Sequence, residues 1–219
     1  MTGVKICGIT NAEDALAAVR CGADAVGFIF YRKSPRYISP EDAKEIIDLL
    51  PESTAKVGVF VNYEISGVKR IMELCRLDLV QLHGNESPVY CSSFDSRQII
   101  KAIAREPGDS PELEQYPVKA LLIDAYDPKR HGGTGKTSDW ELAARISKVR
   151  PLILSGGLNA ENIRDAIRAV SPDAVDINSG VEISPGRKDH RKIHEIVEIV
   201  RASEKHIQKE GSIFSRQLN

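Results

Sequence analysis

Cys7 and Asp124 are titratable residues that each stand at the end of a short apolar run, Gly3–Cys7 and Lys119–Asp124. A thiol and a carboxyl group that flank one substrate are suited to removing a proton and donating one. An ordinary thiol, with a pKa of about 8.5, is mostly protonated at neutral pH, so Cys7 needs a nearby cation or dipole to act as a base. An inert buried thiol and a structural carboxylate explain the spacing equally well.

Small residues follow the seventh and eighth apolar runs of the chain, and they suggest an anion site. Glycine lets backbone N–H groups approach a phosphate closely, and the start of a following helix adds its dipole. We therefore predict phosphate binding at Gly156, Gly157, Asn178, Ser179 and Gly180. The alternative interpretation is that the glycines only permit tight turns.

Arg36 and His83 also follow apolar runs. The guanidinium of Arg36 is suited to binding a substrate carboxylate through two parallel hydrogen bonds, although an ordinary surface charge is the alternative. His83 is either a packed histidine or a wall of the site.

Two other patterns resemble known motifs but lack a required residue. Gly135–Thr137 resembles the end of a phosphate-binding P-loop, but Arg130 stands where that motif requires glycine. His190 and His194 have the spacing of zinc-protease ligands, but Arg191 replaces the required glutamate. We therefore predict neither a nucleotide site nor a catalytic metal, and we interpret the two histidines as part of a solvated helix face.

Eight β-rich apolar runs alternate with helical patterns along the chain. The runs are Gly3–Cys7, Ala25–Phe30, Lys56–Val61, Leu79–His83, Gln98–Ala104, Lys119–Asp124, Pro151–Ser155 and Ala174–Asn178. Strands without polar alternation, each followed by a helix, are typical of a parallel sheet buried on both faces. Eight such units predict an α/β fold, a closed (β/α)8 TIM barrel, whose active site lies at the carboxyl ends of the strands. An open doubly wound sheet is the alternative, but Cys7–Thr10 is no dinucleotide-binding turn.

Several helices are predicted from their first residues. Asn11 and Ser39 are good capping residues, and Pro40 suits the first position of a helix. The helical patterns after Pro88 and around Leu113 are weak, so we expect short helices there.

The composition limits the classes of partner. Thirty Lys and Arg residues against 31 Asp and Glu give a net charge of −1, so neither nucleic acid nor a membrane surface is expected as a partner. The chain lacks a membrane-length apolar run and a secretory signal pattern, and its four cysteines form no C-x-x-C pair; we expect a cytoplasmic protein. We predict one domain over residues 1–202 and a polar C-terminal extension over 203–219.

An ordered set of motifs between residue 4 and about residue 190 resembles one family. The motifs are Lys5–Thr10, Gly27–Phe30 with Ser34–Arg36, Val57–Val61, Gln81–Gly84, Gly132–Thr137, Leu154–Leu158 and Asp176–Glu182. Together they are similar to phosphoribosylanthranilate isomerase of tryptophan biosynthesis. The resemblance implies a barrel enzyme that converts N-(5-phosphoribosyl)anthranilate, a small phosphorylated aminosugar, by an Amadori rearrangement without cofactor or metal.

The resemblance also implies roles for individual residues. Cys7 matches the family's general base and Asp124 its general acid, and Arg36 would hold the anthranilate carboxylate. The further substrate-binding positions are Gln81, His83 and Asp176, and the phosphate-binding positions are the five already named. Whether the barrel forms a homodimer is left open.

Two residues depart from the family pattern. Asn178 stands where serine is usual, and Ser138 stands where an aromatic residue is common, in a predicted mobile loop over Asp127–Asp139. The alternative functions are indole-glycerol-phosphate synthase, the sugar isomerase of histidine biosynthesis, or a noncatalytic phosphate-binding barrel. Cys7 disfavours both enzymes, and the noncatalytic barrel would not need Cys7 and Asp124.

Overall fold

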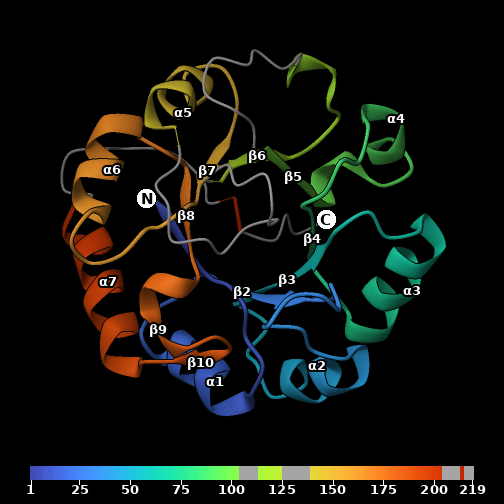
Figure 1. Ribbon diagram of the computed structural model, residues 1–219, viewed down its shortest axis with the longest axis horizontal. Helices are drawn as coiled ribbons and strands as arrows, with labels where there is room; N and C mark the ends of the chain where they lie inside the picture. Colours follow the sequence, from blue (N-terminus) through green and yellow to red (C-terminus); the bar gives the residue numbers. More distant parts are fainter. Residues whose placement is uncertain (104–112, 125–138, 204–212, 215–219) are drawn as a thin grey trace.

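The computed structural model of the protein describes residues 1–103, 113–124, 139–203 and 213–214 (Figure 1). Its eight central strands are β1 (Gly3–Ile6), β2 (Ala25–Ile29), β3 (Ala55–Phe60), β4 (Leu79–Leu82), β5 (Ile99–Ile103), β6 (Ala120–Ile123), β7 (Leu152–Leu154) and β8 (Ala174–Ile177). Each end agrees with the predicted run to within one residue. The apolar runs therefore identified every strand of the central sheet.

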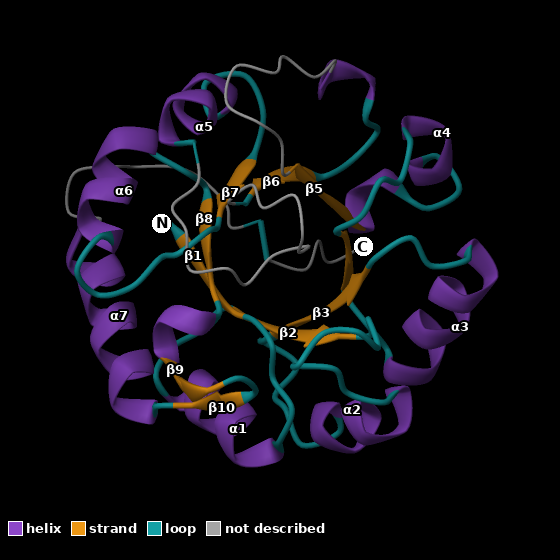
Figure 2. Ribbon diagram, viewed as in Figure 1, coloured by secondary structure: helices purple, strands orange, loops and turns teal. Residues whose placement is uncertain are grey.

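All eight strands are parallel and close into a barrel in chain order, with β8 paired back to β1 (Figure 2). In that last pairing Gly3 lies opposite Ala174, and Lys5 lies opposite Asp176. The helices surround the barrel on its outer side (Figure 2). The prediction of a (β/α)8 barrel is confirmed, and the open sheet is wrong because β1 and β8 leave no free edge.

The first two helices begin directly after the predicted capping residues Asn11 and Ser39. The helices in the described residues are α1 (Ala12–Arg20), α2 (Pro40–Ile47), α3 (Ile65–Cys75), α4 (Pro88–Cys91), α5 (Trp140–Ile146), α6 (Ile163–Val170) and α7 (His190–Ser203). The side chain of Asn11 accepts a hydrogen bond from the N–H of Asp14, and Ser39 caps α2 in the same way. As expected, α4 is short, and the described residues from Leu113 onward begin with the 3-10 turn η2 (Leu113–Gln115).

Alternate residues of each strand face opposite sides of the barrel wall. In β1, Val4 and Ile6 belong to the apolar layer between sheet and helices. Lys5 instead forms hydrogen bonds with Gln81 and Asp176, which come from β4 and β8, so it lies inside the barrel. The barrel interior therefore holds polar side chains from β1, β4 and β8, although these strands are buried on both faces.

The amino-terminal end of the barrel is filled by apolar side chains. The strand residues of this cluster are Ala25, Ala55, Val57, Leu79, Ile100, Ala102, Ala120, Leu122, Ile153 and Ala174. Ile213 and Phe214 join the same cluster and are buried. An atom at the Cβ position of Gly3 would lie 2.9 Å from the Phe214 ring, so the ring packs against the first residue of β1. Two residues of the predicted polar extension thus form part of the barrel floor.

A hairpin that was not predicted follows β8. The 3-10 turn η3 (Ser179–Val181) leads into β9 (Glu182–Ser184), which pairs in antiparallel fashion with β10 (Arg187–Lys188). Some predictions lie outside the described residues: Ala104, the motif Gly132–Thr137, Ser138 and the loop of which it is part.

Candidate active site

Cys7 and Asp124 lie at the carboxyl end of the same barrel. Cys7 directly follows β1, and its N–H donates to the carbonyl of Ile177 in β8 at 2.9 Å. Asp124 directly follows β6, and its N–H donates to the carbonyl of Ile103 in β5 at 3.2 Å. Both residues are buried, with 3% and 7% of their surface exposed. The two predicted titratable groups are therefore held by strand pairing at the end of the barrel where TIM-barrel chemistry takes place.

The thiol of Cys7 lies beside the side chain of Lys5. An atom at the Cβ position of Gly27 would be 2.8 Å from the Cys7 Sγ and 3.0 Å from the Lys5 Cε, so the two side chains flank one point. Burial raises the pKa of the Cys7 thiol, while the Lys5 ammonium and, more weakly, Lys188 oppose that rise. The cation that a cysteine base requires is thus present, although burial still favours the protonated thiol.

Lys5 is fully buried and forms an ion pair with Asp176, with 2.8 Å between Nζ and Oδ1. Its Nζ also donates to the Oε1 of Gln81 at 2.9 Å. Burial alone would lower the pKa of Lys5, but the Asp176 carboxylate and the Cys7 sulfur outweigh it and leave the pKa above its ordinary value. Lys5 is therefore a fixed positive charge inside the barrel.

Gln81 and His83 connect Lys5 to Asp124. The Nε2 of Gln81 lies 2.8 Å from the Nδ1 of His83, and the Nε2 of His83 lies 3.1 Å from the Oδ2 of Asp124. Gln81 and His83 stand two residues apart at the end of β4, so both point into the barrel. The structure thus brings the predicted residues Gln81, His83, Asp124 and Asp176 into one network.

Arg36 lies at the same end of the barrel and is bound to a residue of the hairpin. Its Nε and Nη2 donate to the two carboxylate oxygens of Glu182 at 2.8 and 2.7 Å. Lys188 approaches the same carboxylate at 2.9 Å. Burial would raise the pKa of Glu182, but Arg36 and Lys188 outweigh it and hold the pKa below its usual value. Two cations therefore surround one carboxylate, and one of them, Lys188, also acts on the Cys7 thiol.

The two predicted anion-binding turns pack against each other. Gly156 and Gly157 follow β7 with φ values of 89° and 63°, which suit glycine. A Cβ on Gly180 would lie 2.0 Å from the carbonyl oxygen of Leu158, so only glycine permits this contact. Within the described part of the chain, the N–H groups of Gly156 and Gly157 have no acceptor, which leaves two donors for an anion.

Asn178 faces the Arg36 side of the site. Its side-chain oxygen accepts a hydrogen bond from the Nζ of Lys188 at 3.0 Å. An atom at the Cβ position of Gly8 would lie 2.6 Å from that oxygen and 2.8 Å from the Arg36 Cδ. The phosphate-binding role of Asn178 stays a prediction, and the contacts of its side-chain oxygen connect it to Lys188.

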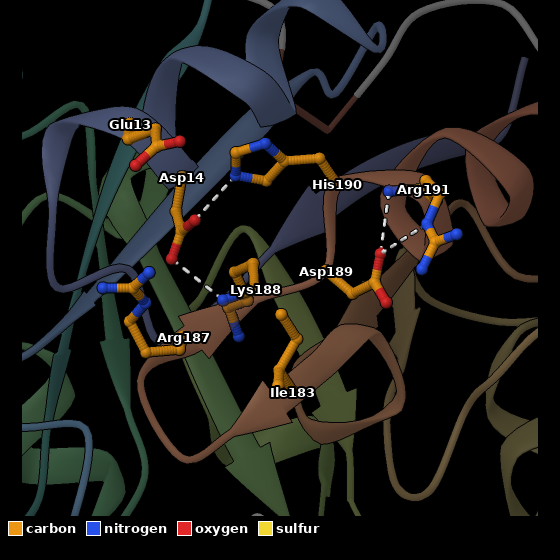
Figure 3. A pocket seen from close by; sticks show the side chains of 8 residues that line it. All are labelled: Glu13, Asp14, Ile183, Arg187, Lys188, Asp189, His190 and Arg191. Atoms are coloured by element: carbon orange, nitrogen blue, oxygen red, sulfur yellow. Dashed lines mark hydrogen bonds and ion pairs between the residues drawn. The ribbon is translucent and has the colours of Figure 1, made fainter.

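The hairpin is anchored to α1 through Asp14, beside the surface pocket in Figure 3. The carboxylate of Asp14 accepts hydrogen bonds from the N–H of Lys188 at 2.9 Å and from the Nε2 of His190 at 2.8 Å. His194 lies on α7, as His190 does, and is exposed. Among the described residues no cluster of His, Cys, Asp and Glu is suited to hold a metal ion. His190 thus has a structural contact rather than the purely solvated position expected for it.

The sequence did not identify Lys5, Glu182 or Lys188 as site residues. Lys5 precedes Cys7 by two positions in one strand, so alternation alone could have placed its side chain inside the barrel. Glu182 and Lys188 belong to a hairpin that gave no strand pattern. A further buried pair, Glu86 with Lys101 at 2.9 Å, also escaped detection; Glu86 accepts the N–H of Gly84, next to His83.

The arrangement can move protons on a small anionic molecule. It offers a thiol beside an ammonium, a carboxyl group held by an imidazole, an arginine for a carboxylate, and two backbone N–H groups that have no acceptor among the described residues. No helix in the described residues is long and apolar enough to cross a membrane.

Comparison with known proteins gives one consistent relationship. The family model described as N-(5'phosphoribosyl)anthranilate (PRA) isomerase matches residues 4–199. The N-(5'-phosphoribosyl)anthranilate isomerase of Syntrophus aciditrophicus is 50% identical over 202 residues, 92% of this chain and 88% of that protein. The isomerase of Geobacter sp. strain M21 is 52% identical over 198 residues, 90% of this chain and 97% of that protein.

Solved structures agree with this relationship. The phosphoribosyl anthranilate isomerase of Thermus thermophilus superposes with a TM-score of 0.84 at 38% identity, covering 92% of this chain and 99% of that one. An isomerase in complex with reduced 1-(o-carboxyphenylamino)-1-deoxyribulose 5-phosphate superposes with a TM-score of 0.80 at 43% identity, covering 92% of this chain and all of that one. Barrel, site residues and relatives together establish that the chain belongs to the N-(5'-phosphoribosyl)anthranilate isomerase family.

Proposed function

We propose that Cys7 and Asp124 are the general base and general acid of the reaction for which the family is named. That reaction converts N-(5-phosphoribosyl)anthranilate to 1-(2-carboxyphenylamino)-1-deoxyribulose 5-phosphate in tryptophan biosynthesis. The observation that carries the proposal is that both groups end strands of one barrel and are joined there by Lys5, Gln81 and His83.

The first step opens the sugar ring. Asp124 donates its proton to the furanose oxygen while the bond from C1′ to that oxygen breaks, and the nitrogen lone pair forms the C1′=N bond of a protonated Schiff base. The contact between His83 and one oxygen of Asp124 supports this role, because a carboxyl group must be oriented to transfer its proton.

The second step removes a proton from carbon. The thiolate of Cys7 takes the C2′ proton, and the electrons of that bond form the C1′=C2′ double bond of an enolamine while the nitrogen becomes neutral. The enolamine then tautomerises to the ketone. Lys5 supports this step, because an ammonium beside the sulfur stabilises its anion.

The two ends of the substrate are anionic and have separate partners. Arg36 binds the anthranilate carboxylate through the guanidinium N–H groups that Glu182 does not use. The phosphate binds to the turns at Gly156, Gly157, Ser179 and Gly180, with Asn178 beside them. His83 contacts the sugar between these two anchors. Gln81 and Asp176 are the remaining substrate-binding candidates, and their contacts with Lys5 favour a supporting role.

An assay that follows loss of substrate fluorescence tests reaction and residues together. The wild-type chain should consume the substrate, whereas Cys7→Ala and Asp124→Asn should each lower kcat by at least ~100-fold, the usual contribution of a general acid or base. Both variants should keep the fold and still bind the reduced product analogue. Near wild-type kcat in either variant would remove that residue from the mechanism.

We further propose a cytoplasmic enzyme that assembles as a homodimer. The phosphoribosylanthranilate isomerase of Thermotoga maritima is a dimer from which monomers have been generated, and the structure of those monomers is 42% identical to this chain with a TM-score of 0.78. Light scattering on the purified protein should give twice the chain mass of 24.1 kDa. A mass of 24.1 kDa would exclude the dimer.

A further inference from the structure

We propose that Gln81 is a positioning residue for the isomerisation. Its amide, held between Lys5 and His83, places the proton of the neutral His83 ring on Nε2, the nitrogen that faces Asp124. The inference rests on the acid role proposed for Asp124. It assigns a purpose to a polar side chain that is 99% buried and whose oxygen and nitrogen both have protein partners.

The argument begins at Lys5, because an ammonium can only donate hydrogen bonds. Its Nζ lies 2.8 Å from Asp176 and 2.9 Å from Gln81, and the carboxylate of Asp176 helps to keep it charged. The atom of Gln81 that faces Lys5 must therefore be an acceptor. This fixes the orientation of the amide, with its oxygen toward Lys5 and its nitrogen toward His83.

The orientation of the amide then fixes His83. The amide nitrogen of Gln81 can only donate, so the Nδ1 of His83, 2.8 Å away, must accept and cannot carry a proton. A neutral imidazole has one N–H, which must then be on Nε2. That nitrogen lies 3.1 Å from the Oδ2 of Asp124 and donates to it.

The contact between the Nε2 of His83 and the Oδ2 of Asp124 contributes to the orientation of this carboxyl group. If the proton of His83 moved to Nδ1, Nε2 could only accept. It would then repel an ionised Oδ2, or it would bind the proton of the carboxyl group and direct that proton away from the substrate. Because proton transfer is sensitive to misplacements of about 1 Å, this tautomer matters for the rate. Gln81 is only 1% exposed, and its amide occupies the space between Lys5 and His83.

The same network reaches the proposed base. Lys5, which orients Gln81, also lies beside the Cys7 thiol, because the Lys5 Cε and the Cys7 Sγ both approach the Cβ position of Gly27. One buried ammonium therefore stabilises the anion of Cys7 directly and orients Asp124 through two intermediate side chains. The groups concerned come from β1, β4, β6 and β8, which only the closed barrel brings together.

The substitution Gln81→Glu tests the tautomer directly. A carboxylate can accept from Lys5 as the amide does, but it can only accept from His83, so Nδ1 must become protonated. Nitrogen-15 spectra of histidine-labelled protein, assigned with His83→Asn, should show a protonated Nε2 and a bare Nδ1 in the wild type. In Gln81→Glu, Nδ1 should carry a proton. A protonated Nδ1 in the wild type, or a bare Nδ1 in Gln81→Glu, would overturn the inference.

The substitution Gln81→Met tests the effect on catalysis, because methionine fills similar space and forms neither hydrogen bond. We expect kcat to fall ~10-fold or more, with KM and affinity for the reduced product analogue changing less than ~3-fold. Gln98→Met, which makes the same change outside the barrel near the start of β5, should leave both constants unaltered. Thermal unfolding of each variant establishes that it is folded at the assay temperature.

The outcomes separate this inference from the proposed function. Active Asp124→Asn would refute the acid role itself. Inactive Asp124→Asn together with wild-type kcat in Gln81→Met would retain the acid role and refute only the positioning by Gln81. A fall in kcat accompanied by an equal loss of analogue affinity would indicate a substrate contact and would also refute it.

Discussion

Two lysines reduce the cost of ionising Cys7, yet its pKa remains above the ordinary value because the thiol is buried. At neutral pH the free protein therefore holds mostly the thiol. The sequence indicated that a cysteine base would need a cation, but it could not identify Lys5 or Lys188, which reach the sulfur through strand alternation and through the hairpin. The proposed role of Cys7 as a base then depends on the small ionised fraction of the thiol, which pH controls.

This predicts a distinct pH dependence for Cys7. Because the raised pKa means that the thiolate fraction keeps growing above neutral pH, both alkylation of Cys7 by iodoacetamide and kcat/KM should rise with pH beyond about 8.5, where an ordinary thiol would begin to level off. Mass spectrometry of the modified peptide measures the first rate separately from the partly exposed Cys21. A plateau in both rates below pH 8 would show that the lysines dominate over burial.

Arg36 provides a second prediction at the scale of single residues. Arg36→Met removes the proposed carboxylate contact but leaves Glu182 paired with Lys188. The KM for the substrate should increase about 10- to 100-fold, the range expected for a lost charged hydrogen-bond pair. The matched measurement uses a substrate analogue with hydrogen in place of the carboxylate. If the variant weakens binding of this analogue equally, Arg36 does not recognise the carboxylate.

At the scale of elements, the hairpin β9–β10 is the part of the site that sequence reasoning missed most completely. Its strands are three and two residues long, too short for any periodicity. Its importance follows from its neighbours: Glu182 binds Arg36, and Lys188 contacts Asn178. Such contacts depend on where the chain returns in space, which local patterns do not specify.

The anchor of this hairpin can be tested through Asp14. Asp14→Ala leaves the buried N–H of Lys188 without its acceptor and should lower the free energy of unfolding by about 1–3 kcal/mol. It should also raise the KM, because Glu182 and Arg36 lose their fixed position. His194→Ala, on the exposed face of α7, serves as the control and should change neither quantity. Equal KM values in the two variants would show that the hairpin holds its position without α1.

At the scale of the whole molecule, the sequence was sufficient for the barrel and for its strand ends. Strands buried on both faces give unbroken apolar runs, and the proposed site residues Cys7 and Asp124 directly follow strands β1 and β6. The inner polar layer was harder to foresee. Whether Lys5 meets Asp176 or Gln81 depends on the register between strands, and that register is set by closure of the entire sheet.

The floor of the barrel gives a prediction for the molecule as a whole. Phe214→Ala should lower the free energy of unfolding by about 3–5 kcal/mol, as expected for removing a buried aromatic ring. Because the active site lies at the opposite end, kcat at a temperature where the protein is folded should stay unchanged. Ile183→Ala, at a position 73% exposed, is the control for stability. Chemical denaturation measures the free energy of unfolding of both variants. An unaltered midpoint for Phe214→Ala would mean that the ring does not stabilise the core.

The place of Phe214 in the chain also bears on the order in which the protein can assemble during its synthesis. The ring belongs to the apolar cluster at the barrel floor, yet it is translated after every strand that contributes to that cluster. Until then the floor of a nascent barrel lacks this ring, and its first strand must wait for β8 before it gains its second partner. Newly made chains should therefore stay dependent on chaperones longer than a barrel whose floor is complete once β8 has emerged.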